Sequence, residues 1–227
     1  NFKAMKGQTI GVIGGTGSGK SSIVNLIPRL YDATQGEVLV DGVNVKDYDI
    51  ETLRNKVGIV MQKAVLFKGT IRENMWMGKK GATDEQIDEA LEISQSKEFV
   101  DSKQGRLDYV IEQGGKNLSG GQRQRLTIAR AIVRKPDVLI LDDSASALDF
   151  ATDAALRKAI RGMNNSPTVF IVSQRAASLM YADLIIVLDD GQVAGMGTHD
   201  ELLANCEVYK EIYESQFKKA DSEGGVA

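Results

Sequence analysis

Short runs of apolar residues occur along this chain, and between them lie stretches whose apolar residues have helical spacing. Uninterrupted runs of four to six mostly apolar residues, bounded by turn residues, are typical of buried strands. Such runs predict strands at 8–13, 57–61, 138–141 and 168–172. Apolar segments also flank two Asp-Gly pairs: the pattern predicts a hairpin or a meander around Asp41-Gly42 and a β-hairpin at Asp190-Gly191.

Helical periodicity dominates residues 70–117. There Thr83 and Gln86 have the spacing of a capping box, and an apolar stripe of Ile87, Ala90 and Leu91 follows. Residues 118–134 predict a loop followed by a helix that ends before Pro136. A second capping box, Thr198 with Glu201, opens helices that reach about Gln216, and we expect the small polar tail, 219–227, to be disordered.

Strands that alternate with helices predict an α/β fold with a mostly parallel sheet. The hairpins add an antiparallel part, and the helical block interrupts the alternation. We therefore expect one domain over 1–227, with a core at about 1–69 and 134–218 and an inserted α-helical subdomain at about 70–133.

Composition narrows the class of protein. The chain is 42% hydrophobic and 26% charged, as in soluble globular domains. Its net charge of −3 gives no basic surplus, so we expect no nucleic-acid partner. Cys206 is the only cysteine, which excludes an internal disulfide and fits a reducing compartment. No apolar run approaches the roughly 20 residues that span a bilayer, so a membrane role requires a partner or another segment.

A glycine-rich loop follows the first predicted strand. It matches the pattern G-x-x-x-x-G-K-[ST] in the context of a strand before it and a helix after it. In such a loop, backbone N–H groups curl around an oxyanion, Lys20 reaches the β- and γ-phosphates, and Ser21 places its hydroxyl on Mg²⁺. The sequence thus predicts a nucleoside triphosphate site with Mg²⁺. Its residues are Gly14, Gly15, Thr16, Gly17, Ser18, Gly19, Lys20, Ser21 and Ser22.

Two adjacent carboxylates, Asp142 and Asp143, end the strand predicted at 138–141. Alone, the pair could share a metal, divide metal binding from base catalysis, or cap a turn. A phosphate loop needs a carboxylate at the end of a neighbouring strand to hold Mg²⁺ through water. We therefore assign Asp142 to the metal.

Several motifs occur in one order: GGTGSGKS, Gln62 after a strand, LSGGQ at 118–122, LILDD, and SALD at 146–149. Together they resemble the nucleotide-binding domain of ATP-binding cassette (ABC) transporters, over nearly the whole chain. LSGGQ is the most specific element. Its Ser119 and Gln122 form a capping-box pattern, and the two glycines leave backbone amides open at a helix start, which makes a second anion site.

The resemblance implies that two such domains meet head to tail. Each ATP then lies between the phosphate loop of one chain and the LSGGQ of the other, here Ser119, Gly120, Gly121 and Gln122. It also implies that Gln62 contacts the metal or the attacking water and relays the nucleotide state to a membrane domain. Asp149 would contact the partner chain across the interface.

Three segments, 66–75, 111–122 and 195–203, resemble exporters in which a membrane domain and an ATPase are fused. This likeness implies a transmembrane domain, expected on the same polypeptide, and a place at the cytoplasmic face of the cell membrane. The family's adenine-stacking aromatic, its strand and the membrane domain would precede residue 1, so we expect the chain to be a C-terminal fragment. The transported substrate is not encoded here.

Two positions depart from the family's hydrolytic set. Asp143 stands where the family has a Glu that orients or deprotonates water, and Gln174 stands where a His contacts the γ-phosphate. Asp is one methylene shorter, about 1.5 Å, and Gln carries no charge. These departures predict slow hydrolysis at this site and a different partner subunit that carries Glu and His. The only histidine, His199, is expected to be a cap or packing residue.

Two other functions remain open from the sequence alone. One is a regulatory ATP-binding module that dimerises on ATP and hardly turns over. The other is a soluble ABC protein that acts on nucleic acid or ribosomes. Chemical competence of Asp143 and Gln174 separates the first from an export motor, and binding to a duplex or a ribosome would identify the second.

Overall fold

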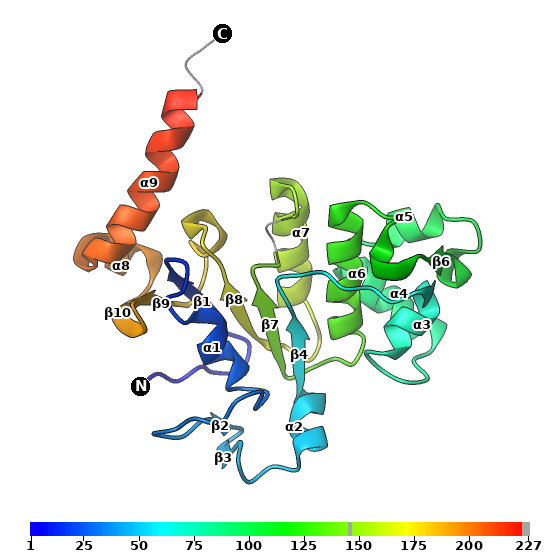
Figure 1. The fold of residues 1–227 in the computed structure, drawn as a ribbon, viewed down its shortest axis with the longest axis horizontal. Helices are drawn as coiled ribbons and strands as arrows, with labels where there is room; N and C mark the ends of the chain where they lie inside the picture. The colour runs from blue at the N-terminus through cyan, green and yellow to red at the C-terminus, as the bar shows by residue number, and fades with distance from the viewer. Residues whose placement is uncertain (145–146, 224–227) are drawn as a thin grey trace. The chain divides into compact units, whose positions relative to one another are not determined.

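The computed structural model describes residues 1–144 and 147–223, with side chains as far as Gln216. The chain falls into two compact units, Asn1–Leu53 with Thr168–Ala227, and Arg54–Pro167. Each is mixed α/β (Figure 1). The sheet is mostly parallel with antiparallel additions, which confirms the predicted fold class.

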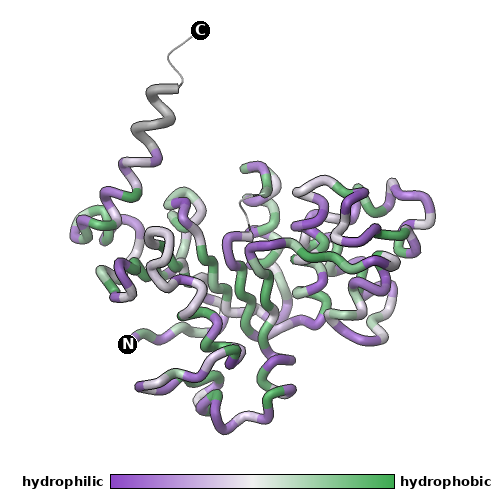
Figure 2. The backbone as a smooth tube through the Cα atoms, viewed as in Figure 1, coloured by the Kyte–Doolittle hydropathy of each residue, from purple (hydrophilic) through white to green (hydrophobic). Residues whose placement is uncertain are grey.

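The first unit is built on four strands in the order β10-β9-β1-β8. Strand β1 (Thr9–Gly14) pairs in parallel with β8 (Thr168–Val172) and with β9 (Leu184–Asp189). All six of its residues are buried, which explains the unbroken apolar run. Figure 2 shows this continuous hydrophobic character along the strands.

Antiparallel pairs and helices complete the first unit. Strand β10 (Gln192–Gly197) turns back on β9 at Asp190-Gly191, and β2 (Leu39–Val40) pairs with β3 (Val43–Asn44) across Asp41-Gly42, so both hairpins are confirmed. The helices are α1 (Lys20–Asn25), α8 (His199–Asn205) and α9 (Glu207–Glu223), with a 3₁₀ turn η3 (Ala176–Ser178). Helix α2 (Ile50–Lys56) runs across the boundary to the second unit.

The second unit carries the parallel pair β4 (Val57–Val60) and β7 (Val138–Asp142), whose register aligns Val60 with Leu141. A two-residue antiparallel pair joins β5 (Gly69–Thr70) to β6 (Val110–Ile111). The helices and 3₁₀ turns of this unit are α3 (Ile71–Trp76), α4 (Asp84–Ile93), α5 (Lys97–Asp101), η1 (Arg106–Asp108), η2 (Gln113–Gly115), α6 (Gly120–Ile132) and α7 (Phe150–Arg161).

Local capping signals explain where several helices begin. Thr83, Ser119 and Thr198 each accept the N3 backbone N–H while the N3 side chain bonds back, as the sequence predicts. Thr70 does the same with Glu73. Each reciprocal pair satisfies two backbone groups that the first helical turn leaves without partners.

The predicted helical block, 70–133, lies inside the second unit, whose bounds are wider because they include β4, β7 and α7. The division into core and subdomain stays a prediction. Helix α9 continues to Glu223, so residues 219–223 are helical where the sequence predicts disorder. Ala, Asp, Ser and Glu continue the helix, and the first helix-breaking pair is Gly224-Gly225. Residues 224–227 lie outside the described residues.

Across residues 1–144 and 147–223, no helix combines the length and the apolar character needed to cross a bilayer.

Candidate functional site

The glycine-rich loop lies between β1 and α1 in the first unit. Lys20 is 9% exposed, and its Nζ donates to the carbonyl oxygens of Gly14 at 3.0 Å and Gly15 at 2.6 Å. Its ammonium group therefore lies against the first two residues of the loop. A cation at a glycine-rich loop that leads into a helix is an arrangement that suits a polyphosphate.

The glycines of this loop are required for two different reasons. Gly17 and Gly19 have φ values of 81° and 93°, which favour glycine, and a Cβ at either would touch nothing within 4 Å. Gly14 is different, because a Cβ there would lie 2.1 Å from the backbone oxygen of Leu188. Glycine at position 14 is therefore required by packing, and glycine at 17 and 19 by the turn.

The loop contains one buried hydroxyl group, that of Ser18. Ser18 is 4% exposed, and its Oγ has no hydrogen-bond partner in the described structure. A buried polar atom without a partner is costly, typically about 1–3 kcal/mol, unless a ligand or water satisfies it. With Lys20 beside it and the exposed hydroxyls of Ser21 and Ser22 at the helix start, the loop residues fit a phosphate chain.

Gln174 emerges beside this loop. The parallel register aligns Val12 of β1 with Val172 of β8. Gly14 and Gln174 each lie two residues further along, so they are at the same end of two adjacent strands. Ser173 N–H donates to the Val12 carbonyl at 3.1 Å, which continues the pairing up to that point. The structure thus brings together the phosphate loop and the residue predicted to contact the γ-phosphate, with the Gln174 side chain exposed.

In the second unit, the same logic joins Gln62 and Asp143. Each lies two residues beyond an aligned pair, Val60 and Leu141, on neighbouring parallel strands. Gln62 Nε2 donates to Asp143 Oδ2 at 3.1 Å. By the family resemblance, Gln62 contacts the metal or the attacking water and Asp143 stands at the position of the base, and these two side chains contact each other.

The two adjacent aspartates differ in setting. Asp142 closes β7 and is 5% exposed, whereas Asp143 is half-buried and has a φ of 46°. The left-handed backbone at Asp143 changes the direction of the chain after β7, so the two adjacent carboxylates differ in exposure. Asp tolerates this conformation better than most residues. Among the described residues, no three or more His, Cys, Asp or Glu side chains form a group that could hold a metal.

LSGGQ forms the start of α6. Ser119 is the N-cap, and its Oγ accepts from Gln122 N–H at 3.2 Å while Gln122 Oε1 accepts from Ser119 N–H at 3.1 Å. Leu118 is buried, and Arg123 donates to its carbonyl at 2.7 Å. Gly120 is exposed at the first turn. Sequence reasoning missed Arg123, whose anchoring role depends on contacts that no motif reveals.

The cap makes one prediction about stability. Replacing Ser119 with Ala is expected to lower the free energy of unfolding by about 1 kcal/mol, because the N3 amide loses its acceptor. Ser119→Asn is the matched control, because its side-chain oxygen can still accept from the N3 amide, so little loss is expected. Chemical denaturation of the two variants measures the difference, and equal losses would contradict the capping role.

Asp149 also has a local role. Its Oδ1 accepts from Thr152 N–H at 2.9 Å, and its Oδ2 accepts from Thr152 Oγ1 at 2.8 Å, so it caps α7. These bonds hold the pKa of Asp149 below its usual range, with the backbone bond from Thr152 as the main cause. Residues 145 and 146 lie outside the described residues, so the predicted SALD motif is described only from Ala147 to Asp149.

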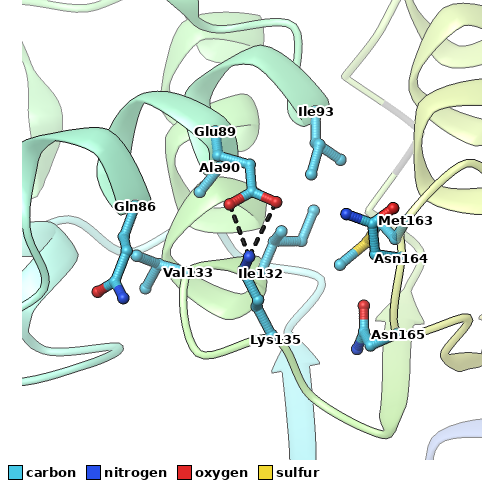
Figure 3. A pocket seen from close by; sticks show the side chains of 10 residues that line it. All are labelled: Gln86, Glu89, Ala90, Ile93, Ile132, Val133, Lys135, Met163, Asn164 and Asn165. Carbon is cyan, nitrogen blue, oxygen red and sulfur yellow. Dashed lines mark hydrogen bonds and ion pairs between the residues drawn. The ribbon is translucent and has the colours of Figure 1, made fainter.

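A small surface hollow lies elsewhere in the second unit (Figure 3). An ion pair, Lys135 Nζ to Glu89 Oε2 at 2.7 Å, crosses it, and Asn165 Nδ2 donates to the Pro136 carbonyl at 2.7 Å. It contains none of the predicted site residues, and its two charged side chains, Lys135 and Glu89, pair with each other. Its lining comprises Gln86, Glu89, Ala90, Ile93, Ile132, Val133, Lys135, Met163, Asn164 and Asn165.

Comparisons with known proteins show the family to which this chain belongs. The family model described as "ABC transporter" matches residues 1–146. The chain is 45% identical over 223 residues to an uncharacterized ABC transporter ATP-binding protein, YfiB, of Bacillus subtilis, covering 98% of this chain and 39% of the relative. It is 39% identical over 216 residues to a putative multidrug export ATP-binding/permease protein of Staphylococcus aureus, covering 95% of this chain and 37% of that protein.

A solved structure gives the same result. A bacterial Atm1-family ABC exporter with ATP bound matches with a TM-score of 0.90 and 33% identity, covering 95% of this chain and 38% of that one. The chain thus spans between 37% and 39% of the length of these proteins. It belongs to the ABC transporter family, as an ATP-binding domain. Domains of this family bind ATP, generally with Mg²⁺, and are generally ATPases.

Proposed function

We propose that this domain binds MgATP, pairs head to tail with a second ABC nucleotide-binding domain, and powers export across a membrane while its own site hydrolyses ATP slowly. The observation that carries the proposal is that one chain bears two glycine-containing loops at helix starts, one in each unit, both of a kind that suits an anion. The first is the Lys20 loop with the unpartnered Ser18 hydroxyl. The second is the capped start of α6. A second copy or relative would supply the complementary loop to each nucleotide.

The residues take distinct roles in this proposal. The glycine loop from Gly14 to Ser22 holds the phosphates, and Lys20 turns from the loop carbonyls toward the β- and γ-oxygens. Ser21, Asp142 and Gln62 would hold Mg²⁺, with Asp142 acting through water. Ser119 to Gln122 contact the nucleotide bound to the partner, and Asp149 contacts the partner chain while it caps α7. Mg²⁺, when bound, neutralises charge that develops on the phosphates.

The slow hydrolysis that we propose is explained by the side chains expected near the attacking water and the γ-phosphate, Asp143 and Gln174. A general base must reach within about 2.6–3.2 Å of the proton that it takes. Asp143 is one methylene shorter than the family's Glu and already accepts a hydrogen bond from Gln62. Gln174, in turn, can donate to a γ-phosphate oxygen but adds no positive charge.

The partners proposed for the whole protein come from its relatives. The Staphylococcus aureus relative is named as a multidrug export ATP-binding/permease protein, and the solved structure is an ABC exporter. We infer a transmembrane domain, expected on the same polypeptide, a partner subunit that carries Glu and His, and a place at the cytoplasmic face of the cell membrane. Asp143 and Gln174 also favour one alternative, a regulatory module that binds ATP with little turnover.

A charge placed in the second loop tests the head-to-tail arrangement. A Cβ at Gly120 would meet only the far end of Arg123, at 3.9 Å, so Gly120→Asp should fold normally. The new carboxylate would repel the partner's triphosphate. We expect turnover of the assembled protein to fall by about tenfold or more, since charged hydrogen bonds are lost. MgATP affinity at this chain's own phosphate loop should stay within about twofold, because that loop is untouched.

The control is Asn164→Asp, which adds the same charge at an exposed position of the same unit, outside both loops. Hydrolysis and equilibrium binding of a fluorescent ATP analogue would be measured on the intact assembly. Normal turnover in Gly120→Asp would reject the exchange of loops between chains. Loss of both turnover and own-site affinity would show a fold defect, and Gly120→Ser would then repeat the test without the charge.

A further inference from the structure

A side chain from the C-terminal helix reaches the loop that carries Gln174. Gln216 of α9 donates from Nε2 to the Gln174 carbonyl at 2.7 Å, and its Oε1 accepts from Ala176 N–H at 2.9 Å. One amide group therefore satisfies two backbone groups on either side of Arg175. No motif at 209–216 signals this contact.

Helix α9, which carries Gln216, is anchored through residues that precede Gln216 in the helix. Tyr209 is fully buried, and a hydrogen bond of 2.8 Å joins its OH to His199 Nδ1. The Tyr213 ring lies 5.3 Å from the His199 ring, centroid to centroid. Residues 209 and 216 are seven apart, so they share one face of the helix. The packing of His199 confirms its predicted packing role and fixes the face from which Gln216 extends.

The Gln174 backbone is held from its other side as well. Ser173, 4% exposed, accepts from Arg175 N–H at 2.9 Å through its Oγ and donates its own N–H to Val12 in β1. Ala176 is fully buried. The peptide groups around Gln174 are thus bound to β1 and to α9, while the Gln174 side chain is exposed. The direction in which that side chain leaves the loop is set by these bonds.

We propose that Gln216 is a positioning residue for Gln174, and that α9 thereby sets how the nucleotide site distinguishes ATP from ADP. The inference rests on the proposed function for its γ-phosphate contact. The two hydrogen bonds from Gln216 to the backbone of residues 174 and 176, which we call the clamp, do not depend on that function. Gln is suited to the task because it donates and accepts at one end, whereas Glu accepts only and Leu does neither.

The test uses Gln216→Leu and Gln216→Glu in the intact assembly. Without the clamp, we expect faster amide hydrogen exchange in the peptide that covers 173–179, by about tenfold for the Ala176 amide in Gln216→Leu. Gln216→Glu keeps the Ala176 acceptor but places a carboxylate oxygen against the Gln174 carbonyl. It should therefore disturb the loop while leaving the Ala176 amide partly protected. Matched controls are Gln192→Glu, an exposed Gln in the same unit, and Ser215→Ala, on the same helix.

The functional readout is the ratio of the dissociation constants for MgADP and MgATP at this site. Gln216→Leu should lower that ratio by about threefold to tenfold, mainly through weaker ATP binding, because a mispositioned Gln174 loses one hydrogen bond to the γ-phosphate. In a Gln174→Ala background the same substitution should have no further effect on the ratio. Such non-additivity separates positioning from general destabilisation.

Each outcome has one meaning. Unchanged exchange at 173–179 in both variants would overturn the clamp. Faster exchange with an unchanged ratio, while Gln174→Ala alone lowers the ratio, would overturn the positioning role. If Gln174→Ala itself leaves the ratio unchanged, the γ-phosphate contact in the proposed function fails, and the positioning role fails with it even where the clamp is confirmed. A lower ratio together with faster exchange, abolished in the Gln174→Ala background, supports the proposal.

Discussion

Asp143→Glu combined with Gln174→His is expected to raise ATP hydrolysis at this site by about a hundredfold, the lower end of what a positioned general base contributes. Glu extends the carboxylate by about 1.5 Å, beyond the contact that Gln62 makes with Asp143. His adds a group that can carry positive charge near the γ-phosphate. Both changes lie where adjacent strands end, Gln174 beside the phosphate loop and Asp143 beside Gln62.

Single variants separate the two contributions. Asp143→Glu alone should recover most of the gain, because proton removal from water is the missing step, and Gln174→His alone should change turnover little. Asp143→Asn is the control, since it has the same size but cannot act as a base. The φ of 46° at position 143 makes Glu slightly less favourable there, so thermal unfolding should be recorded for each variant. No gain in the double variant, with folding and binding intact, would reject the assignment of these positions.

Lys20→Met is expected to weaken MgATP binding by about a hundredfold, because a buried ammonium that would bond to phosphate oxygens is lost. The side chain is 9% exposed and close in length to Met, so the space is kept while the charge is removed. Isothermal titration of MgATP into the intact protein measures the change.

Lys6→Met is the matched control, since Lys6 is exposed in the same unit and lies outside the loop. Ser18→Ala provides a second variant that removes the unpartnered hydroxyl without touching the charge. It should weaken binding by about tenfold, as for one hydrogen bond. Unchanged affinity in a folded Lys20→Met protein would remove the phosphate loop from the site.

Features set by a few neighbouring residues could be predicted from the sequence. The strands at β1, β4, β7 and β8 come from unbroken apolar runs, and three capping boxes come from pairs three residues apart. The hairpins follow from Asp-Gly turns. In each case, local chemistry and the final environment favour the same conformation.

Features set by long-range contacts could not be predicted. The bond between Gln62 and Asp143 joins residues 81 apart, and it depends on the register between β4 and β7. Gln216 reaches back 42 residues to Gln174 from a helix face defined by buried Tyr209. Helix α2 carries only a short, mixed pattern; besides a local cap, in which Thr52 N–H donates to Asp49 Oδ2, its packing buries Leu53. Propensity alone does not decide such segments.

The most direct test of the account is a single-turnover measurement on the unsubstituted intact assembly. MgATP would be bound at this domain's phosphate loop, excess nucleotide removed, and the bound nucleotide identified over time. The account predicts tight binding and recovery of the nucleotide as intact ATP for many turnover times of the whole assembly. Conversion to ADP at the rate of overall turnover would contradict it, because Asp143 would then be an effective base.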